Sequence, residues 1–354
     1  MARIHRQTGS LHDLLGEIGD NRINGLDDIN AFKKNYSTTS SEIKEKAKLV
    51  VAQDIENLGN KIGQLSADFN TKLKENKDRL ESEKADLEHK ILLLPDGQGN
   101  FFIALVRRIK RYRLLRRKAY LEAHFDEEAR EPLKLLQAEV SALTDTLKNH
   151  EENINLLAER EASPQINRLS MIKSVLEHNN HLYLGAIGEE NVLTELEKLP
   201  NSFFVINDFR KTFYPPIYNK KLDDRIGSIQ VDHIVCGPTG LFIIETKNWS
   251  EYSFQNVDFF SPVTQVQRFN FALFVVLNQA VASGSLHSFI THLGDQKISP
   301  INIVATLKPP PSQEFQYVKI ISCYSLRSHI ENSKRILSED NVNDLEQFLL
   351  GECS

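Results

Sequence analysis

Two carboxylates and an ammonium interrupt two strongly apolar stretches of this chain. Asp232 lies within 229–235, and Glu245 and Lys247 close the stretch 241–247. Charged side chains are seldom buried unless they are paired or hold a metal. Carboxylate oxygens suit Mg²⁺, or Mn²⁺ in its place, and such a cation assists phosphodiester hydrolysis by activating water and stabilising charge. The residue types and the D-x₁₂-E-x-K spacing therefore predict a metal-assisted phosphodiesterase site.

The surrounding elements must bring these residues together. Pro-Thr-Gly at 238–240 predicts a tight turn between two antiparallel strands. Alternation along the second strand places Glu245 and Lys247 on one face, with Thr246 between them supplying a backbone carbonyl as a further metal ligand. A simpler alternative is an exposed ion pair between Glu245 and Lys247, with Asp232 at a β-bulge. Such a pair contributes only about 0–1 kcal/mol.

Three sequence blocks resemble the nuclease-related domain (NERD) of the PD-(D/E)xK nuclease-like group. They read "GAIGEENVLTEL" (185–196), "QVDHIVCGPTGLFIIETKNW" (230–249) and "SPVTQVQRFNFAL" (261–273). The resemblance covers about residues 181–280 and implies a nuclease fold. The chain departs from the family pattern in a longer insert at 209–227. It also has Ser-Pro where the family tends to have Asn-Pro.

The resemblance implies a role for each matching residue. Glu189 matches the helix-borne glutamate of the first block, and Asp232 matches the metal-ligand aspartate. Glu245 and Lys247 match the E-x-K pair. Gln265 matches a glutamine near the metal or the substrate phosphate. The candidate catalytic residues are Glu189, Asp232, Glu245, Lys247 and Gln265, and the candidate metal ligands are Asp232, Glu245, Thr246 and Glu189.

Several residues near the site also have a structural interpretation. Glu189 and Glu190 would suit the first turn of a helix, where the helix dipole favours acids. Gln265 would be a surface residue at a helix start. His233 alternates with Asp232, so it points to the other face of the strand.

The aromatic residues and glycines nearby are typical of packing. Trp249 and Phe242 suit a core better than base stacking. Gly185 and Gly188 would allow a helix to approach the sheet closely.

The C-terminal part alternates between helical and strand patterns, which predicts an α/β fold with a mixed sheet flanked by helices. The resemblance implies that this sheet is PD-(D/E)xK-like. A Pro- and Lys-rich loop is expected at 214–227, between the first strand and the hairpin around the 238–240 turn. The other expected elements are helices at 188–199, 263–283 and 339–350, and strands at 203–208, 301–306 and 318–323.

The N-terminal part has a different composition, rich in Glu, Lys, Leu and Ala. Apolar residues recur at heptad spacing over 41–162, which predicts an antiparallel coiled-coil hairpin with its tip near 95–100. Pro132 is expected to kink or restart the second arm. The predicted domains are a weakly structured segment at 1–40 with a short helix near 10–18, the coiled coil at 41–162, a connector at 163–180, and the nuclease-like domain at 181–354.

The segment 107–118 has eight basic residues among twelve. We favour cross-arm ion pairs in the hairpin, with the acids of 75–88 opposite this segment. Contact with nucleic acid is the next interpretation, and attachment to a membrane surface through 101–118 is the third. The candidate nucleic-acid contacts are Arg107, Arg108, Lys110, Arg111 and Arg113.

Charge and cysteine content limit how the chain could bind nucleic acid and where it is expected in the cell. The 354 residues have a net charge of −5, with 14 basic and 19 acidic side chains in 181–354. An acidic nuclease domain must bind nucleic acid through a local basic patch or metal ions. The three cysteines lack metal-ligand spacing, and no long apolar span or signal peptide is seen, which favours a cytoplasmic protein without an integral membrane span.

The leading hypothesis is a metal-dependent nuclease that acts on DNA, with RNA as the alternative substrate. Its coiled coil would form a homo-oligomer or target the enzyme. A role in bacterial defence or DNA processing follows by analogy alone. The alternative is a non-catalytic nucleic-acid-binding or scaffold protein that binds partners through the coiled coil.

Overall fold

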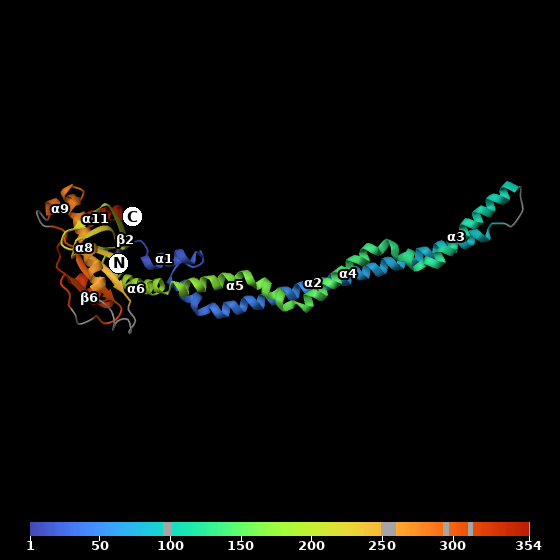
Figure 1. Cartoon of the computed structure of the whole chain (residues 1–354), viewed down its shortest axis with the longest axis horizontal. Helices are drawn as coiled ribbons and strands as arrows, with labels where there is room; N and C mark the ends of the chain where they lie inside the picture. The colour runs from blue at the N-terminus through green and yellow to red at the C-terminus, as the bar shows by residue number, and fades with distance from the viewer. Residues whose placement is uncertain (95–100, 249–259, 293–296, 311–313, 354) are drawn as a thin grey trace. The chain divides into compact units, whose positions relative to one another are not determined.

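The computed structural model describes residues 1–94, 101–248, 260–292, 297–310 and 314–353. The chain divides into two compact units, one formed by residues 1–35 and 170–354 and the other by 36–169 (Figure 1). We call the first the sheet unit and the second the hairpin unit. In the described residues, no helix is long and apolar enough to cross a membrane.

The sheet unit is built on a six-stranded mixed sheet, in the order β1-β2-β3-β4-β5-β6. β2, β3 and β4 are antiparallel neighbours, whereas β1 pairs with β2, β4 with β5, and β5 with β6 in parallel. The predicted α/β class is confirmed. The strands are β1 (Arg3–His5), β2 (Phe204–Asn219), β3 (Asp224–Gly237), β4 (Gly240–Lys247), β5 (Ile301–Thr306) and β6 (Val318–Ser322).

Helices cover both faces of this sheet because the central strands are apolar on both sides. One core joins the sheet to α8 (Phe260–Ala282), α9 (His287–His292) and α11 (Glu339–Glu352). The opposite core joins it to α6 (Asn180–Leu196) and α10 (Cys323–Glu331). Continuous apolar runs of this kind are typical of strands buried on both faces.

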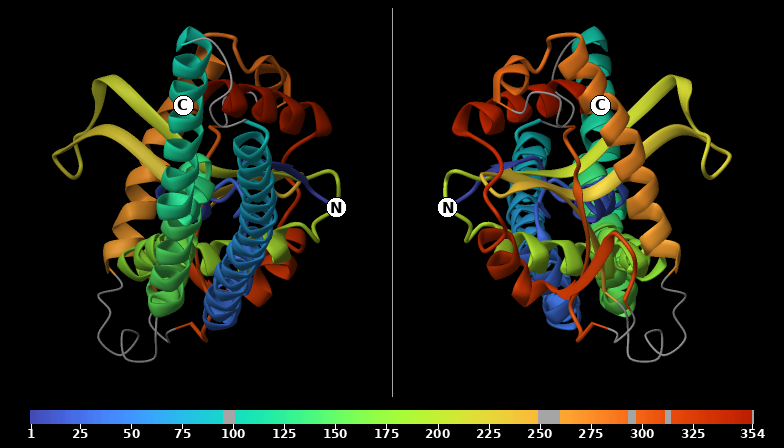
Figure 2. Two further views of the ribbon diagram at one scale, coloured as in Figure 1. Left: turned by 90° about the vertical axis from the view of Figure 1, so that its right-hand side faces the viewer. Right: turned by 90° about the vertical axis from the view of Figure 1, so that its left-hand side faces the viewer.

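The segment 214–227 was wrongly predicted to be a loop. It forms the outer ends of β2 and β3, which project as a ribbon beyond the helices (yellow in Figure 2). The register of this ribbon shifts between Thr212 and Ile217, at Pro215 and Pro216. An irregularity of this kind lets a β-ribbon accommodate prolines, which have no N–H to donate.

The first 35 residues belong to the sheet unit and are more ordered than predicted. The expected short helix is present as α1 (Gly9–Ile18), but β1 precedes it and α2 (Leu26–Leu92) begins soon after. Residues of α1 and the start of α2 pack with α5 (Ile154–His178) and α6 in a third core. The predicted separate segment at 1–40 therefore differs from the observed division.

The expected connector at 163–180 is helical almost throughout. α5 runs through Pro164 to His178, and α6 begins at Asn180 rather than near residue 188. The hairpin unit nevertheless ends at residue 169, close to the predicted end at 162–168, so the boundary falls within a continuous helix.

The hairpin unit pairs α2 with α3 (Phe101–Arg130) and α4 (Lys134–Glu152). A 3₁₀ turn at Glu131–Leu133 separates α3 from α4 and contains Pro132, so the predicted restart is confirmed. The predicted tip at 95–100 lies outside the described residues.

Cross-arm ion pairs join the hairpin and include the end of the basic segment. Arg117 Nε is 3.0 Å from Glu83 Oε1, and Lys118 Nζ is 2.8 Å from Glu88 Oε1. In the part of the hairpin that the structure describes, no ion pair involves Arg108, Lys110 or Arg113. The favoured interpretation of 107–118 is therefore confirmed for its last two residues.

Candidate functional site

The candidate site lies where β3 and β4 open away from their shared turn. Gly237 pairs with Gly240 beside the turn, and the ladder runs to His233 opposite Ile244. Asp232 follows this last pair on β3, and its Oδ2 accepts a 2.6 Å hydrogen bond from the Thr246 N–H. This bond ties Asp232 to the strand segment that carries Glu245 and Lys247, so the predicted convergence is seen.

Glu245 is the most buried member of the group. Its side chain is paired through Oε1 with Lys247 Nζ at 2.6 Å, and the residue is only 2% exposed. Its other oxygen, Oε2, is buried and has no hydrogen-bond partner among the described residues. Burial raises the pKa of Glu245, although Lys247 and Gln265 act in the opposite direction. A buried carboxylate oxygen without a partner is costly and indicates a position for an additional ligand.

Asp232 shares this electrostatic cost. Burial raises its pKa well above the usual value, and the charges of Glu245 and Glu189 raise it further. The Thr246 N–H and Lys247 oppose the shift. Three carboxylates therefore act on one another across β3, β4 and α6.

Glu189 is delivered by α6 and held by α1. Its Oε2 accepts a 3.1 Å hydrogen bond from the Ser10 N–H, and its Oε1 accepts one from Ser10 Oγ. Burial raises the pKa of Glu189, Ser10 lowers it, and Asp208 and Glu245 raise it. Ser10 was missed from the sequence because it stands 179 residues before its partner.

The helix-dipole interpretation of Glu189 and Glu190 was wrong. α6 begins at Asn180, so both acids stand in its interior rather than in its first turn. Glu190 instead accepts a 3.0 Å hydrogen bond from Thr8 Oγ1. Both acids therefore attach α6 to the N-terminal segment.

Lys247 remains an ammonium in this environment. Burial alone would lower its pKa, but the charge and hydrogen bond of Glu245, with Asp232 and Glu189, raise it overall. A lysine of this kind supplies positive charge and does not act as a general base near neutral pH. The exposed-pair alternative is not supported, because the Glu245 side chain is buried.

Asp208 is a further acid near the site that the sequence prediction overlooked. It has a positive φ of 48° and lies between residues paired with His233 and Val231 on β3. Its Oδ1 accepts hydrogen bonds from Arg210 Nε at 2.8 Å and Gln230 Nε2 at 3.0 Å. The only sequence signal was a polar residue at the end of a buried strand run.

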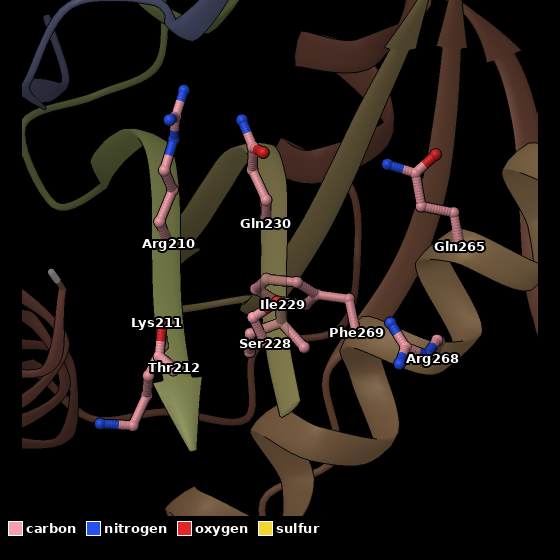
Figure 3. Close-up of a pocket in the computed structure, with 9 residues that line it drawn as sticks. All are labelled: Arg210, Lys211, Thr212, Ser228, Ile229, Gln230, Gln265, Arg268 and Phe269. Atoms are coloured by element: carbon pink, nitrogen blue, oxygen red, sulfur yellow. The ribbon is translucent and has the colours of Figure 1, made fainter. Parts of the chain in front are cut away.

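A cavity of about 370 Å³ lies beside these residues, between β2, β3 and α8. Gln265 lines it and also lowers the pKa of Glu245, so the cavity adjoins the carboxylates. Figure 3 shows Arg210 and Gln230 pointing the same way from neighbouring strands, with Gln265 directed toward them from α8. Among the described residues, the lining of this cavity includes the bases Arg210, Lys211 and Arg268 and no acid.

No ready-made metal centre appears in the described ranges, where no three His, Cys, Asp or Glu side chains gather to hold an ion. The oxygens of Glu189 are engaged by Ser10, and one oxygen of Asp232 by Thr246. The predicted ligand set of Asp232, Glu245, Thr246 and Glu189 therefore stays a prediction. Two carboxylates, Asp232 and Glu245, remain close to each other and to Lys247.

His233 and Phe242, which neighbour the site residues in the sequence, have structural roles. His233 is buried, bonds Asn207 Oδ1 through Nδ1 at 2.8 Å, and has its pKa lowered to about 3 by burial, as a structural histidine would. Phe242 is in the α6 core. Trp249 lies outside the described residues.

The predicted close approach of α6 to the sheet is confirmed at Gly188, whereas Gly185 faces α1 instead. A Cβ on Gly188 would lie 3.1 Å from the Asn248 Cβ, and one on Gly185 would lie 2.7 Å from Ser10 Oγ.

Comparison with known families supports the sequence resemblance. The family model described as nuclease-related domain (NERD) matches residues 184–291, which include α6, β2 to β4 and α8. The match extends over all five candidate catalytic residues. No curated protein and no solved structure gives a significant match to the chain.

Proposed function

We propose that the sheet unit is a metal-dependent nuclease that hydrolyses phosphodiester bonds. Its preferred substrate would be DNA, and RNA is the alternative substrate. The observation that carries this proposal is the buried, unpartnered Oε2 of Glu245, which lies in a group with Asp232 and Lys247. The nuclease-related match over 184–291 supports the same class of reaction.

The residues present fit a hydrated divalent cation. Mg²⁺ usually keeps several waters and binds proteins through one or two carboxylates, so it does not need a complete protein cage. Asp232 and Glu245 would hold it, and a cation there would offset the cost of burying both carboxylates and the repulsion that Glu245 and Glu189 exert on Asp232. When bound, it would supply Lewis-acid stabilisation of the negative charge that develops on the phosphate.

The chain's own side chains would position the reactants. Hydrolysis adds a water oxygen to phosphorus, breaks the P–O bond to the leaving nucleotide, and transfers a proton to the leaving oxygen. The Lys247 ammonium would stabilise the phosphate oxygens and orient the attacking water. Glu189 would orient water from α6, and the amide of Gln265 would donate to the phosphate.

The adjoining cavity gives the polynucleotide a route to these residues. Arg210, Lys211 and Arg268 line it and would bind phosphates next to the one that is cleaved. Each base is also ion-paired, Arg210 with Asp208, Lys211 with Glu352 and Arg268 with Asp224, so phosphates would compete with these acids.

The hairpin unit would serve oligomerisation or targeting of this nuclease. If the hairpin unit forms oligomers, light scattering of the full-length protein should give a mass that is a multiple of the chain mass of 40.4 kDa. A role in bacterial defence or DNA processing would be one context for such an enzyme.

Cleavage assays on defined substrates test the proposal. Plasmid, linear and single-stranded DNA and RNA are incubated with the purified chain in Mg²⁺, Mn²⁺ or EDTA. We expect cleavage that EDTA abolishes and that Asp232→Ala or Lys247→Ala lowers at least about 100-fold. Asp340→Ala and Lys334→Ala are matched controls, because both residues are exposed and outside the site.

The possible results separate the two functional hypotheses. Cleavage that persists in both site variants contradicts the proposed site. Binding of nucleic acid without cleavage under every metal condition favours the scaffold function.

A further inference from the structure

The far end of the hairpin unit carries an exposed apolar surface followed by a basic one. Phe101 and Phe102 begin α3 and are 74% and 73% exposed. On the other arm, Leu92 ends α2 and is exposed, as is Leu93 after it. The remaining exposed apolar residues near this end are Ile103, Leu105, Val106, Ile109, Tyr112 and Leu115. Soluble surfaces rarely gather so much apolar area without a partner.

Among the described residues, this end of α3 before Leu114 contributes no side chain to the apolar cluster between the arms. The apolar cluster that joins α2 and α3 is formed by Leu80, Leu87, Leu121 and Ala129, with Leu114 at its margin. The buried residues of α3 are Leu121 and Ala129, both beyond the basic segment. The exposed residues before Leu114 are therefore available to an external partner.

Charge and apolarity separate along the axis of α3 and not around it. Residues 101–106 are all apolar, and 107–118 then contain eight bases and no acid. At 1.5 Å per residue, the apolar stretch is about 9 Å long.

We propose that the end of the hairpin formed by Leu92, Leu93 and residues 101–113 docks end-first into an anionic phospholipid surface. The apolar residues enter the interface, and Arg108, Lys110 and Arg113 lie at headgroup depth. These three cations have no ion pair in the described part of the hairpin, so they are available for lipid phosphates. Long basic side chains extend readily toward headgroups while their stems stay in apolar surroundings.

Charge and exposed apolar area favour lipid over two other partners. A nucleic-acid backbone would engage the bases but leave the phenylalanines and aliphatic residues of 101–106 in water. A second copy docked on the same surface would place two basic segments against each other, which is repulsive. An anionic bilayer satisfies both the apolar residues and the cations.

Vesicle sedimentation with the full chain tests this surface. The chain is mixed with vesicles of phosphatidylcholine alone or with phosphatidylserine, in EDTA, and the bound fraction is measured after centrifugation. We expect binding to the anionic vesicles that falls as salt is raised. Phe101→Ser/Phe102→Ser/Val106→Ser and Arg108→Gln/Lys110→Gln/Arg113→Gln should each weaken it by about tenfold or more.

A matched control separates this effect from a general loss of surface apolarity. Leu49→Ser/Leu135→Ser/Leu156→Ser removes three exposed apolar residues elsewhere in the hairpin unit and should leave vesicle binding unchanged. Circular dichroism and light scattering of every variant report helix content and mass.

Four results would overturn the proposal. They are no binding to either kind of vesicle, equal weakening by the control, and undiminished binding by the apolar variant. The fourth concerns oligomeric state. If the parent chain is a dimer that does not bind vesicles, and the apolar variant is a monomer, the surface binds a second copy of the chain. If the charge variant weakens DNA binding while vesicle binding is unchanged, the bases contact DNA instead.

Discussion

At the scale of single residues, the candidate site is a set of acids whose proximity costs stability. Burial raises the pKa values of Glu189, Asp232 and Glu245, and repulsion from neighbouring acids raises those of Glu189 and Asp232 further. The folded chain therefore holds protons on these groups at pH values where the unfolded chain has released them. Their contribution to stability falls as pH rises from about 4, the usual carboxyl pKa, through the raised values.

Asp232→Asn should therefore stabilise the chain in the absence of metal. The amide removes one charge and still accepts from the Thr246 N–H, which donates to Oδ2 at 2.6 Å. We expect the melting temperature in EDTA at pH 8 to rise by about 2–4 °C, the change that about 1 kcal/mol gives in a domain of this size. The gain should shrink at pH 5, where the parent acid is more fully protonated.

Thermal unfolding at both pH values, with and without Mg²⁺, provides the measurement. Mg²⁺ should stabilise the parent chain more than Asp232→Asn, because a ligand that binds only the folded state raises its stability. Asp340→Asn serves as an exposed control. A melting temperature that falls equally at pH 5 and pH 8 would show that Asp232 is a structural hydrogen-bond acceptor and not a strained acid.

At the scale of elements, the site depends on how closely α6 approaches β4. A Cβ at Gly188 would be 3.1 Å from the Asn248 Cβ and 3.3 Å from the Thr246 Cγ2. Glu189 follows directly, so any displacement of α6 moves this carboxylate relative to Asp232 and Glu245. The helix therefore positions the acid through a glycine contact with the strand that carries the E-x-K residues.

Gly188→Val should impair cleavage and stability together. The branched side chain would overpack the α6–β4 contact, and we expect a loss of about 1–3 kcal/mol in the free energy of unfolding. Cleavage by the folded fraction should fall by about tenfold, because small misplacements of reacting groups are costly. Gly351→Val is the matched control, since that helical glycine has open space around it. Equal effects of both substitutions would point to helix propensity instead.

Local sequence patterns predicted some helices and strands of the sheet unit and missed others. The central strands and the helices around them were predictable because each has a long apolar pattern, and Asp232, Glu245 and Lys247 stood out as charges within it. β1 was missed because it is three residues long and pairs with a strand about 200 residues later. Ser10 and Asp208 were missed for a related reason, since their roles come only from partners brought close by the fold.

At the scale of the whole molecule, the nuclease-related match is shorter than the unit that folds. The match covers 184–291, but β1 extends the sheet, Ser10 holds Glu189, and Arg3 Nη2 pairs with Glu346 Oε2 at 2.8 Å. A chain limited to residues 181–354 would leave these partners unsatisfied. We expect it to be insoluble or to unfold well below the melting temperature of the full sheet unit.

The hairpin unit, in contrast, should be removable. Ile29 and Phe32 of α2 pack with Ile172 and Leu176 of α5 inside the sheet unit, which brings the two ends of the excised segment into the same core. A flexible Gly/Ser linker of about 12 residues, which spans roughly 20 Å, would join residues 35 and 170.

The shortened chain should unfold cooperatively and keep the metal-dependent cleavage proposed for the sheet unit. It should also lose vesicle binding, because residues 92–113 are absent. Differential scanning calorimetry, cleavage assays and vesicle sedimentation on the same preparation measure these three properties. A shortened chain that fails to fold would show that residues 36–169 stabilise the sheet unit, whereas a folded chain without cleavage would show that catalysis needs the hairpin.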